Sequence, residues 1–247
     1  YKRQALKSAL SAEGFSIEGG VADIPTAFVA SYGSGEPVIA VMGEFDALPG
    51  ISQAAVPFEQ KIEGKNAAQA CGHHLFGAGS AGAAIAVKEW LERTGTPGTI
   101  QFFGTPAEEG GSGKVYMVRA GLFDDVDTVI HWHPSSVNAA DSASTLANRS
   151  AKFTFSGVSS HAASAPDRGR SALDAVEAMN FMVNLLREHV PTSTRLHYVI
   201  TNGGSAPNVV PNTAQSFYYV RHPNETTLRE IWAVSYTHLT LPTTGSV

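Results

Sequence analysis

The chain has 247 residues, a formal net charge of −5 and 43% hydrophobic residues, a composition typical of a folded protein with one large or two smaller domains. Lysines and arginines number 17 and do not cluster, so we expect neither a nucleic-acid nor a membrane partner. No apolar run is long enough for a membrane-spanning helix. A single cysteine cannot form a disulfide within the chain, which favours the cytoplasm.

The first elements lead to a pair of carboxylates. Residues from Tyr1 onward have the apolar spacing of a helix that has already begun, so we expect the native N-terminus to lie upstream. A short strand is predicted at 27–30. The continuous apolar run at 37–42 is typical of a parallel strand buried on both faces, and Glu44 and Asp46 follow it directly.

The only cysteine begins the segment on which the first half of the chain depends. Cys71 precedes His73 by two residues, and thiolate and imidazole are ligands that zinc prefers. A helix is predicted over 80–93, and its small residues suit burial. Alone, the spacing is a weak signal, because a half-buried cysteine beside ordinary loop histidines is the commoner situation.

Two more predicted strands end in residues of similar chemistry. The strand at 99–103 leads to two adjacent glutamates, and the strand at 127–130 leads to two histidines, with a short helix at 114–120 between them. These residues are Glu108, Glu109, His131 and His133. Because sites in open parallel sheets lie at the carboxyl ends of the strands, we expect one convergent metal site. Neighbouring side chains diverge, so one glutamate can bind metal while the other acts as a base.

After residue 150 the pattern becomes that of a small α+β domain. The predicted elements are a strand at 151–155, a helix at 171–188, strands at 196–200 and 216–220, and a helix capped by Asn224. We therefore place a catalytic, metal-binding domain at 1–150 and a second domain at 151–232. The tail at 233–247 is expected to break the last helix and to be non-native sequence.

Six motifs occur along the chain in one order. They are Gly43-Glu44-Phe45-Asp46-Ala47-Leu48-Pro49, Ala70-Cys71-Gly72-His73-His74, Thr105-Pro106-Ala107-Glu108-Glu109-Gly110-Gly111, Trp132-His133-Pro134, Gly157-Val158-Ser159-Ser160-His161-Ala162 and Gly203-Gly204-Ser205-Ala206-Pro207-Asn208-Val209-Val210-Pro211. With them, the chain resembles the aminoacylase and carboxypeptidase-type zinc amidohydrolases, a metallopeptidase family. The resemblance implies an open, mostly parallel α/β catalytic domain, incomplete in this chain, and a ferredoxin-like lid or dimerisation domain.

The resemblance also assigns roles at the metal site. The implied ligands of Zn²⁺ or Mn²⁺, with two ions in a complete site, are Cys71, His73, Glu109 and His133. Glu108 is the implied general base, and Asp46 is the carboxylate that orients or supports the site. His74 replaces an aspartate common in the wider family, which leaves the ligands of the second ion open.

In the lid, the resemblance assigns substrate handling to three residues. His161, Asn208 and Arg221 are expected to bind the carboxylate of the substrate and the oxyanion, with His161 acting on the site of a partner subunit. A guanidinium suits carboxylates because it binds them in a bidentate manner. We therefore expect a homodimer, or a heterodimer with a related subunit, that forms through the lid.

The implied reaction is hydrolysis of an amide between an acyl or aroyl group and an amino acid, with p-aminobenzoyl-glutamate as the preferred substrate. N-acyl amino acids and small peptides are alternatives within the family. A different class, a non-catalytic carboxylate-binding or dimerisation module, also stays open. Because the family's catalytic domain resumes after the lid, we expect this chain to be a fragment with weak or no activity of its own.

Overall fold

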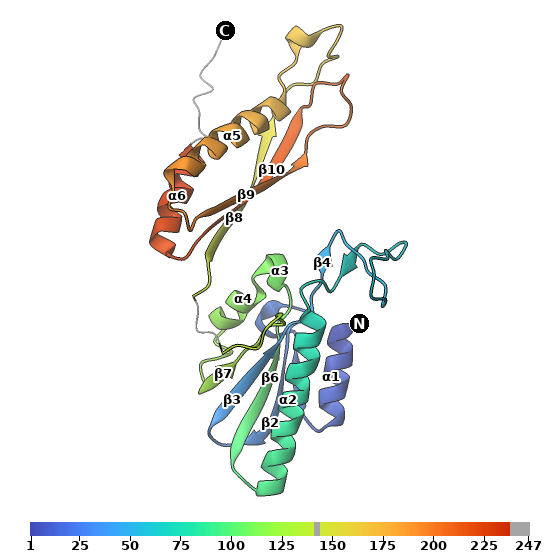
Figure 1. Ribbon diagram of the computed structural model, residues 1–247, viewed down its shortest axis with the longest axis vertical. Helices are drawn as coiled ribbons and strands as arrows, with labels where there is room; N and C mark the ends of the chain where they lie inside the picture. Colours follow the sequence, from blue (N-terminus) through green and yellow to red (C-terminus); the bar gives the residue numbers. More distant parts are fainter. Residues whose placement is uncertain (141–143, 238–247) are drawn as a thin grey trace. The chain divides into compact units, whose positions relative to one another are not determined.

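The computed structural model describes residues 1–140 and 144–237, which divide into two compact units between Ala139 and Ala140 (Figure 1). Each unit has its own sheet and its own hydrophobic core. The division precedes the first strand of the second sheet, β8 (Ala147–Ser156), whereas the sequence pattern placed the boundary at 150. Among the described helices, none has the length and apolar character needed to cross a membrane.

The first unit is built on a five-stranded mixed sheet in the order β1-β2-β6-β3-β7. Strands β6, β3 and β7 are parallel to one another, whereas β2 is antiparallel to both of its neighbours, β1 and β6. The predicted open sheet with flanking helices is confirmed. The sheet is mixed, because β2 is antiparallel to both of its neighbours. The strands are β1 (Ser16–Gly19), β2 (Phe28–Ser34), β3 (Val38–Gly43), β6 (Gly98–Gly104) and β7 (Thr128–Ile130).

Helices cover both faces of this sheet. On one face, α1 and α2 pack over stacked Phe28 and Phe102, which are fully buried. On the other face, α4 places Met117 against Val29 and Phe103. Burial of each such side chain contributes about 1.5–3 kcal/mol to the stability of the fold. The helices are α1 (Lys2–Ala12), α2 (His73–Thr94), α3 (Glu108–Gly111) and α4 (Gly113–Arg119), and a short hairpin pairs β4 (Leu48–Pro49) with β5 (Ala67–Ala68).

The second unit has a three-stranded antiparallel sheet in the order β8-β10-β9, with α5 and α6 packed on it. Side chains of β10 alternate between the buried and the more open face. On the buried face, the hydroxyls of Ser216 and Tyr218 both donate to Oδ1 of Asn180 on α5. The remaining elements are α5 (Ala172–Leu186), β9 (Arg195–Asn202), β10 (Thr213–His222) and α6 (Glu225–Thr237).

The last helix is longer than the sequence pattern predicts. Asn224 caps it as expected, because its Oδ1 accepts a hydrogen bond from the Thr227 amide at 3.0 Å. However, α6 continues to Thr237, so the break expected from Val234 onward is wrong for 234–237. These residues keep the helix because the sequence there lacks proline and glycine. The rest of the expected non-native tail, 238–247, lies outside the described residues.

Candidate metal centre

The parallel strands and the start of one helix carry acidic and histidine side chains to one edge of the first sheet. Glu44 follows β3, the adjacent glutamates follow β6, and His133 follows β7. Strands β3 and β6 end level, since Gly43 pairs with Gly104. Helix α2 begins at His73, so its first side chain enters the same region.

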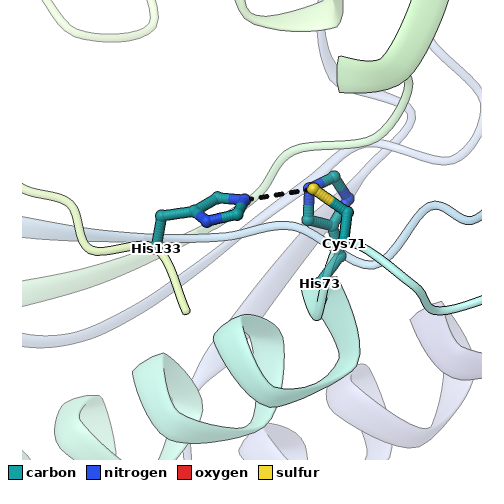
Figure 2. A group of neighbouring side chains, drawn as sticks. All are labelled: Cys71, His73 and His133. Atoms are coloured by element: carbon teal, nitrogen blue, oxygen red, sulfur yellow. Dashed lines mark hydrogen bonds between the residues drawn. The ribbon is translucent and has the colours of Figure 1, made fainter. Parts of the chain in front are cut away.

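A thiol and two imidazoles form the first group of potential ligands. Ligand atoms of Cys71, His73 and His133 all lie within 4.8 Å of one another (Figure 2). The Cys71 Sγ atom is 3.4 Å from His133 Nε2. Gly72 permits this approach, because it has φ +81° and a Cβ there would lie 2.9 Å from the Pro134 ring. The glycine thus lets the cysteine turn pack closely against the loop that carries His133.

His73 also belongs to a second group, with two carboxylates. Its ligand atoms and those of Glu44 and Glu108 again lie within 4.8 Å of one another. His73 is 1% exposed, and its Nδ1 is 2.8 Å from Asp46 Oδ1. The other Asp46 oxygen accepts a hydrogen bond from the Glu109 amide at 3.0 Å. Asp46 therefore orients the imidazole so that Nε2 faces the glutamates, as a carboxylate does behind many metal-bound histidines.

Three buried polar atoms here fit a divalent cation. Glu44 Oε2, His73 Nε2 and Glu109 Oε1 are among the buried side-chain atoms of the described residues that have no hydrogen-bond partner. Buried polar atoms are otherwise almost always paired, so these need a counterpart. Thiolate, imidazole and carboxylate are the donor types of zinc, and the latter two also suit manganese. The residues present therefore fit a divalent metal ion.

Burial and neighbouring carboxylates raise the pKa values of two side chains at this edge. Burial raises the pKa of the Cys71 thiol to about 11, with further contributions from Glu109, Glu108 and Glu44. Burial also raises the pKa of Glu108, assisted by Glu44 and Glu109. With this pKa and no cation nearby, Cys71 is a protonated thiol at neutral pH, which disfavours a role as nucleophile. A bound cation would lower the pKa of the thiol and stabilise the thiolate that ligates metal.

This gives a prediction for the reactivity of the metal-free chain. At pH 8 we expect Cys71, the single cysteine, to react with iodoacetamide roughly a hundredfold more slowly than an unperturbed thiol, because the thiolate fraction falls with the raised pKa. Intact-mass spectrometry gives the rate between pH 7 and pH 11, which should keep rising up to about pH 11. A plateau near pH 9 would contradict this, and added Zn²⁺ should slow the reaction further.

The substrate-handling residues expected from the resemblance all lie in the second unit, but not together. His161 pairs with Val209, and the Ala162 amide donates to the Asn208 carbonyl at 3.0 Å, so His161 and Asn208 are neighbours. Arg221 is near the far end of β10, roughly 25 Å along the strand from its start at Thr213. One copy of this unit therefore does not bring Arg221 to the other two.

The sequence interpretation missed one member of the site. Lys114 on α4 forms an ion pair with Glu44, which is 2% exposed. The sequence offered one indication that Lys114 belongs to the site, because this lysine follows the two glutamates within the same glycine-rich segment. His131, the other histidine after β7, packs its ring edge-on against Phe76 with a centroid distance of 4.9 Å, and its Nε2 is 4.0 Å from Glu44 Oε1.

Comparison with known proteins identifies relatives of this chain. The chain is 47% identical over 235 residues to one subunit of the Escherichia coli (strain K12) p-aminobenzoyl-glutamate hydrolase, and the match covers 94% of this chain and 49% of that protein. It is 33% identical over 210 residues to the Mus musculus Xaa-Arg dipeptidase, covering 81% and 45% of the two chains. The chain thus spans about half the length of these relatives.

A solved structure and a family profile extend the comparison. A Bacillus subtilis protein described as a dinuclear metal-binding peptidase of the M20 family has a TM-score of 0.59 and 19% identity, with 96% of this chain and 62% of that chain covered. Its likeness supports the fold. Residues 40–223 match the profile of Peptidase family M20/M25/M40. The match covers more than half of the chain, which therefore belongs to Peptidase family M20/M25/M40.

Proposed function

We propose that this chain is the metal-binding part of an amidohydrolase that cleaves an amide between an aroyl or acyl group and an amino acid. The observation that carries the proposal is the group of Cys71, His73 and His133 beside two adjacent glutamates. The name of the E. coli relative supports p-aminobenzoyl-glutamate as the substrate. Because the chain spans half of that relative, the activity belongs to a protein of the relative's full length.

In this proposal Cys71, His73, Glu109 and His133 hold Zn²⁺ or Mn²⁺, with room for two ions in the complete site. Asp46 acts behind His73, through the 2.8 Å contact with its Nδ1. The bound metal supplies Lewis-acid polarisation of the amide carbonyl and of water. Metal choice between zinc and manganese follows availability as well as ligand type.

Glu108 is the proposed general base. Its side chain is 46% exposed, so a water molecule can reach it, whereas the Glu109 side chain is 21% exposed and has a buried, unpaired oxygen. Glu108 takes a proton from the attacking water and then hands it to the nitrogen of the leaving amine, which avoids expelling an amide anion. In this proposal Glu108 is therefore the base and Glu109 a metal ligand.

For the second unit we propose a ferredoxin-like lid at 151–232 that handles the substrate carboxylate and mediates dimerisation. The β-α-β-β-α order and the antiparallel sheet support this. His161 and Asn208 lie together, and Arg221 lies roughly 25 Å away along β10, so the three meet at one site only if two protomers contribute. The partner is then a second copy or a related protein, and the E. coli relative, which is named as one subunit of its hydrolase, supports such an assembly.

A dipeptidase is the second candidate function, supported by the 33% identity to a Xaa-Arg dipeptidase. The metal chemistry is the same, and the side chain of the substrate differs. A non-catalytic carboxylate-binding module is the rival from another class. A reducing, cytoplasmic setting suits all of these, because the site needs Cys71 as a free thiol.

A graft tests the proposal. The matching part of the E. coli relative is replaced by residues 1–232 of this chain, and the product is assayed with p-aminobenzoyl-glutamate, with an N-acyl amino acid and with an Xaa-Arg dipeptide. We expect metal-dependent hydrolysis with the highest kcat/KM for p-aminobenzoyl-glutamate. A preference for the dipeptide would favour the second candidate. A folded, metal-loaded graft without hydrolysis of any substrate would favour the non-catalytic module and refute the proposal.

A further inference from the structure

One carboxylate of the metal centre has a partner on only one side. Glu44 is 2% exposed, and its Oε1 forms an ion pair with Lys114 Nζ. Its Oε2 lies 3.0 Å from His73 Nε2, yet neither of these two atoms has a hydrogen-bond partner. A buried carboxylate oxygen therefore contacts a buried ring nitrogen, and neither atom has a hydrogen-bond partner.

The contact is unfavourable as it stands when the imidazole is neutral. His73 Nδ1 faces Asp46 Oδ1 at 2.8 Å, so the ring proton belongs on Nδ1 and Nε2 presents a lone pair. Glu44 Oε2 also presents lone pairs. Two buried acceptors at 3.0 Å need a positive group near both of them, and Lys114 does not supply it because its ammonium lies on the other oxygen of Glu44.

We infer that Glu44 is a further donor of the metal centre through Oε2, and that Lys114 is a positioning residue that holds the other oxygen. The inference rests on the metal site of the proposed function. Glu44 belongs to the second group of potential ligands, with His73 and Glu108, and shares His73 with the group of Cys71 and His133. His74 is exposed and belongs to neither group of potential ligands among the described residues. Its backbone amide donates a hydrogen bond to the Gln69 side chain.

The alternative is that Glu44 and Lys114 form an ion pair with a structural role only. In that case Glu44 serves to balance the ammonium, and the removal of both charges leaves metal binding intact. Breaking one member of a partly buried pair destabilises the fold, whereas replacing both by neutral groups of similar size is often tolerated. The double variant therefore separates the two roles.

The experiment measures bound metal and affinity for Zn²⁺ or Mn²⁺ alone, by mass spectrometry of the metal content and by calorimetric titration, in the full chain. The variants are Glu44→Gln, Lys114→Met, their combination and Cys71→Ala, each with its thermal unfolding recorded. We expect the combination to unfold near the wild-type temperature but to bind about one ion fewer. Lys114→Met alone should weaken binding about 10- to 100-fold, as expected for a residue behind a metal donor.

The outcomes distinguish this inference from the proposed function. Wild-type metal content in Glu44→Gln/Lys114→Met, with loss in Cys71→Ala, would overturn the inference and leave the metal site of the proposed function intact. Unchanged metal content in Cys71→Ala as well would refute that site. If Glu44→Gln alone does not fold because Lys114 is left unpaired, the double variant still gives the result.

Discussion

Replacing Glu108 by glutamine is expected to lower kcat of the grafted enzyme by about 10²- to 10⁴-fold and to leave its metal content unchanged. The same replacement at Glu109 is expected to lower the metal content itself. A side-chain amide cannot take a proton from water near neutral pH, so Glu108→Gln removes the base. At Glu109 it replaces an anionic ligand by a weaker neutral one.

The structure alone allows the reverse assignment, which makes the pair of variants informative. Each glutamate places one oxygen 3.9 Å from His73 Nε2. What distinguishes them is access, since Glu109 Oε1 is buried without a hydrogen-bond partner whereas Glu108 is open to solvent. The two changes are identical in chemistry and adjacent in sequence, so each variant is the control for the other.

Metal content by mass spectrometry and kcat on p-aminobenzoyl-glutamate are the two measurements. Loss of metal in Glu108→Gln together with full metal in Glu109→Gln would reverse the roles of ligand and base. Loss of activity and of metal in both variants would mean that the two side chains act as ligands together. Full activity in Glu108→Gln would exclude it as the base.

Much of the first unit follows from the sequence because its strands are apolar runs that end in charged residues. The run that became β3 and the strand that became β6 differ from their predicted limits by one residue or so, and the residues after them meet as expected. The convergence of Cys71, His73 and His133 follows from the order of strands and the rule for parallel sheets. Local pattern and topology point to the same site here.

Other features depend on packing that a sequence pattern does not reveal. Strand β1 is four residues long and mostly exposed, so its alternation carries little signal. The ion pair between Lys114 and Glu44 joins positions 70 apart in the chain. Likewise, a motif match does not tell that Arg221 lies at the opposite end of β10 from Asn208, because that separation follows from the length of the strand.

Replacing Gly77 by alanine is expected to lower the free energy of unfolding of the first unit by about 1–3 kcal/mol and to weaken metal binding. Gly77 lies on α2 where the helix crosses the end of β3. A Cβ there would lie 2.6 Å from the Glu44 carbonyl oxygen, and a Cβ on Gly43 would lie 3.3 Å from the Gly77 Cα. Because the obstructing atom is backbone, the helix must move away, and His73 at its first position moves with it.

Gly82→Ala is the matched control on the same helix. It is exposed, and a Cβ there meets no atom within 4 Å, so the substitution should stabilise the helix by roughly 0.5–1 kcal/mol without changing metal affinity. Urea unfolding and calorimetric Zn²⁺ titration compare the two variants. Equal effects at both glycines would show that helix propensity, and not the contact between α2 and β3, decides the result. Destabilisation at Gly77 with unchanged metal affinity would mean that His73 and Glu44 keep their places when the helix shifts, which the close packing at this point argues against.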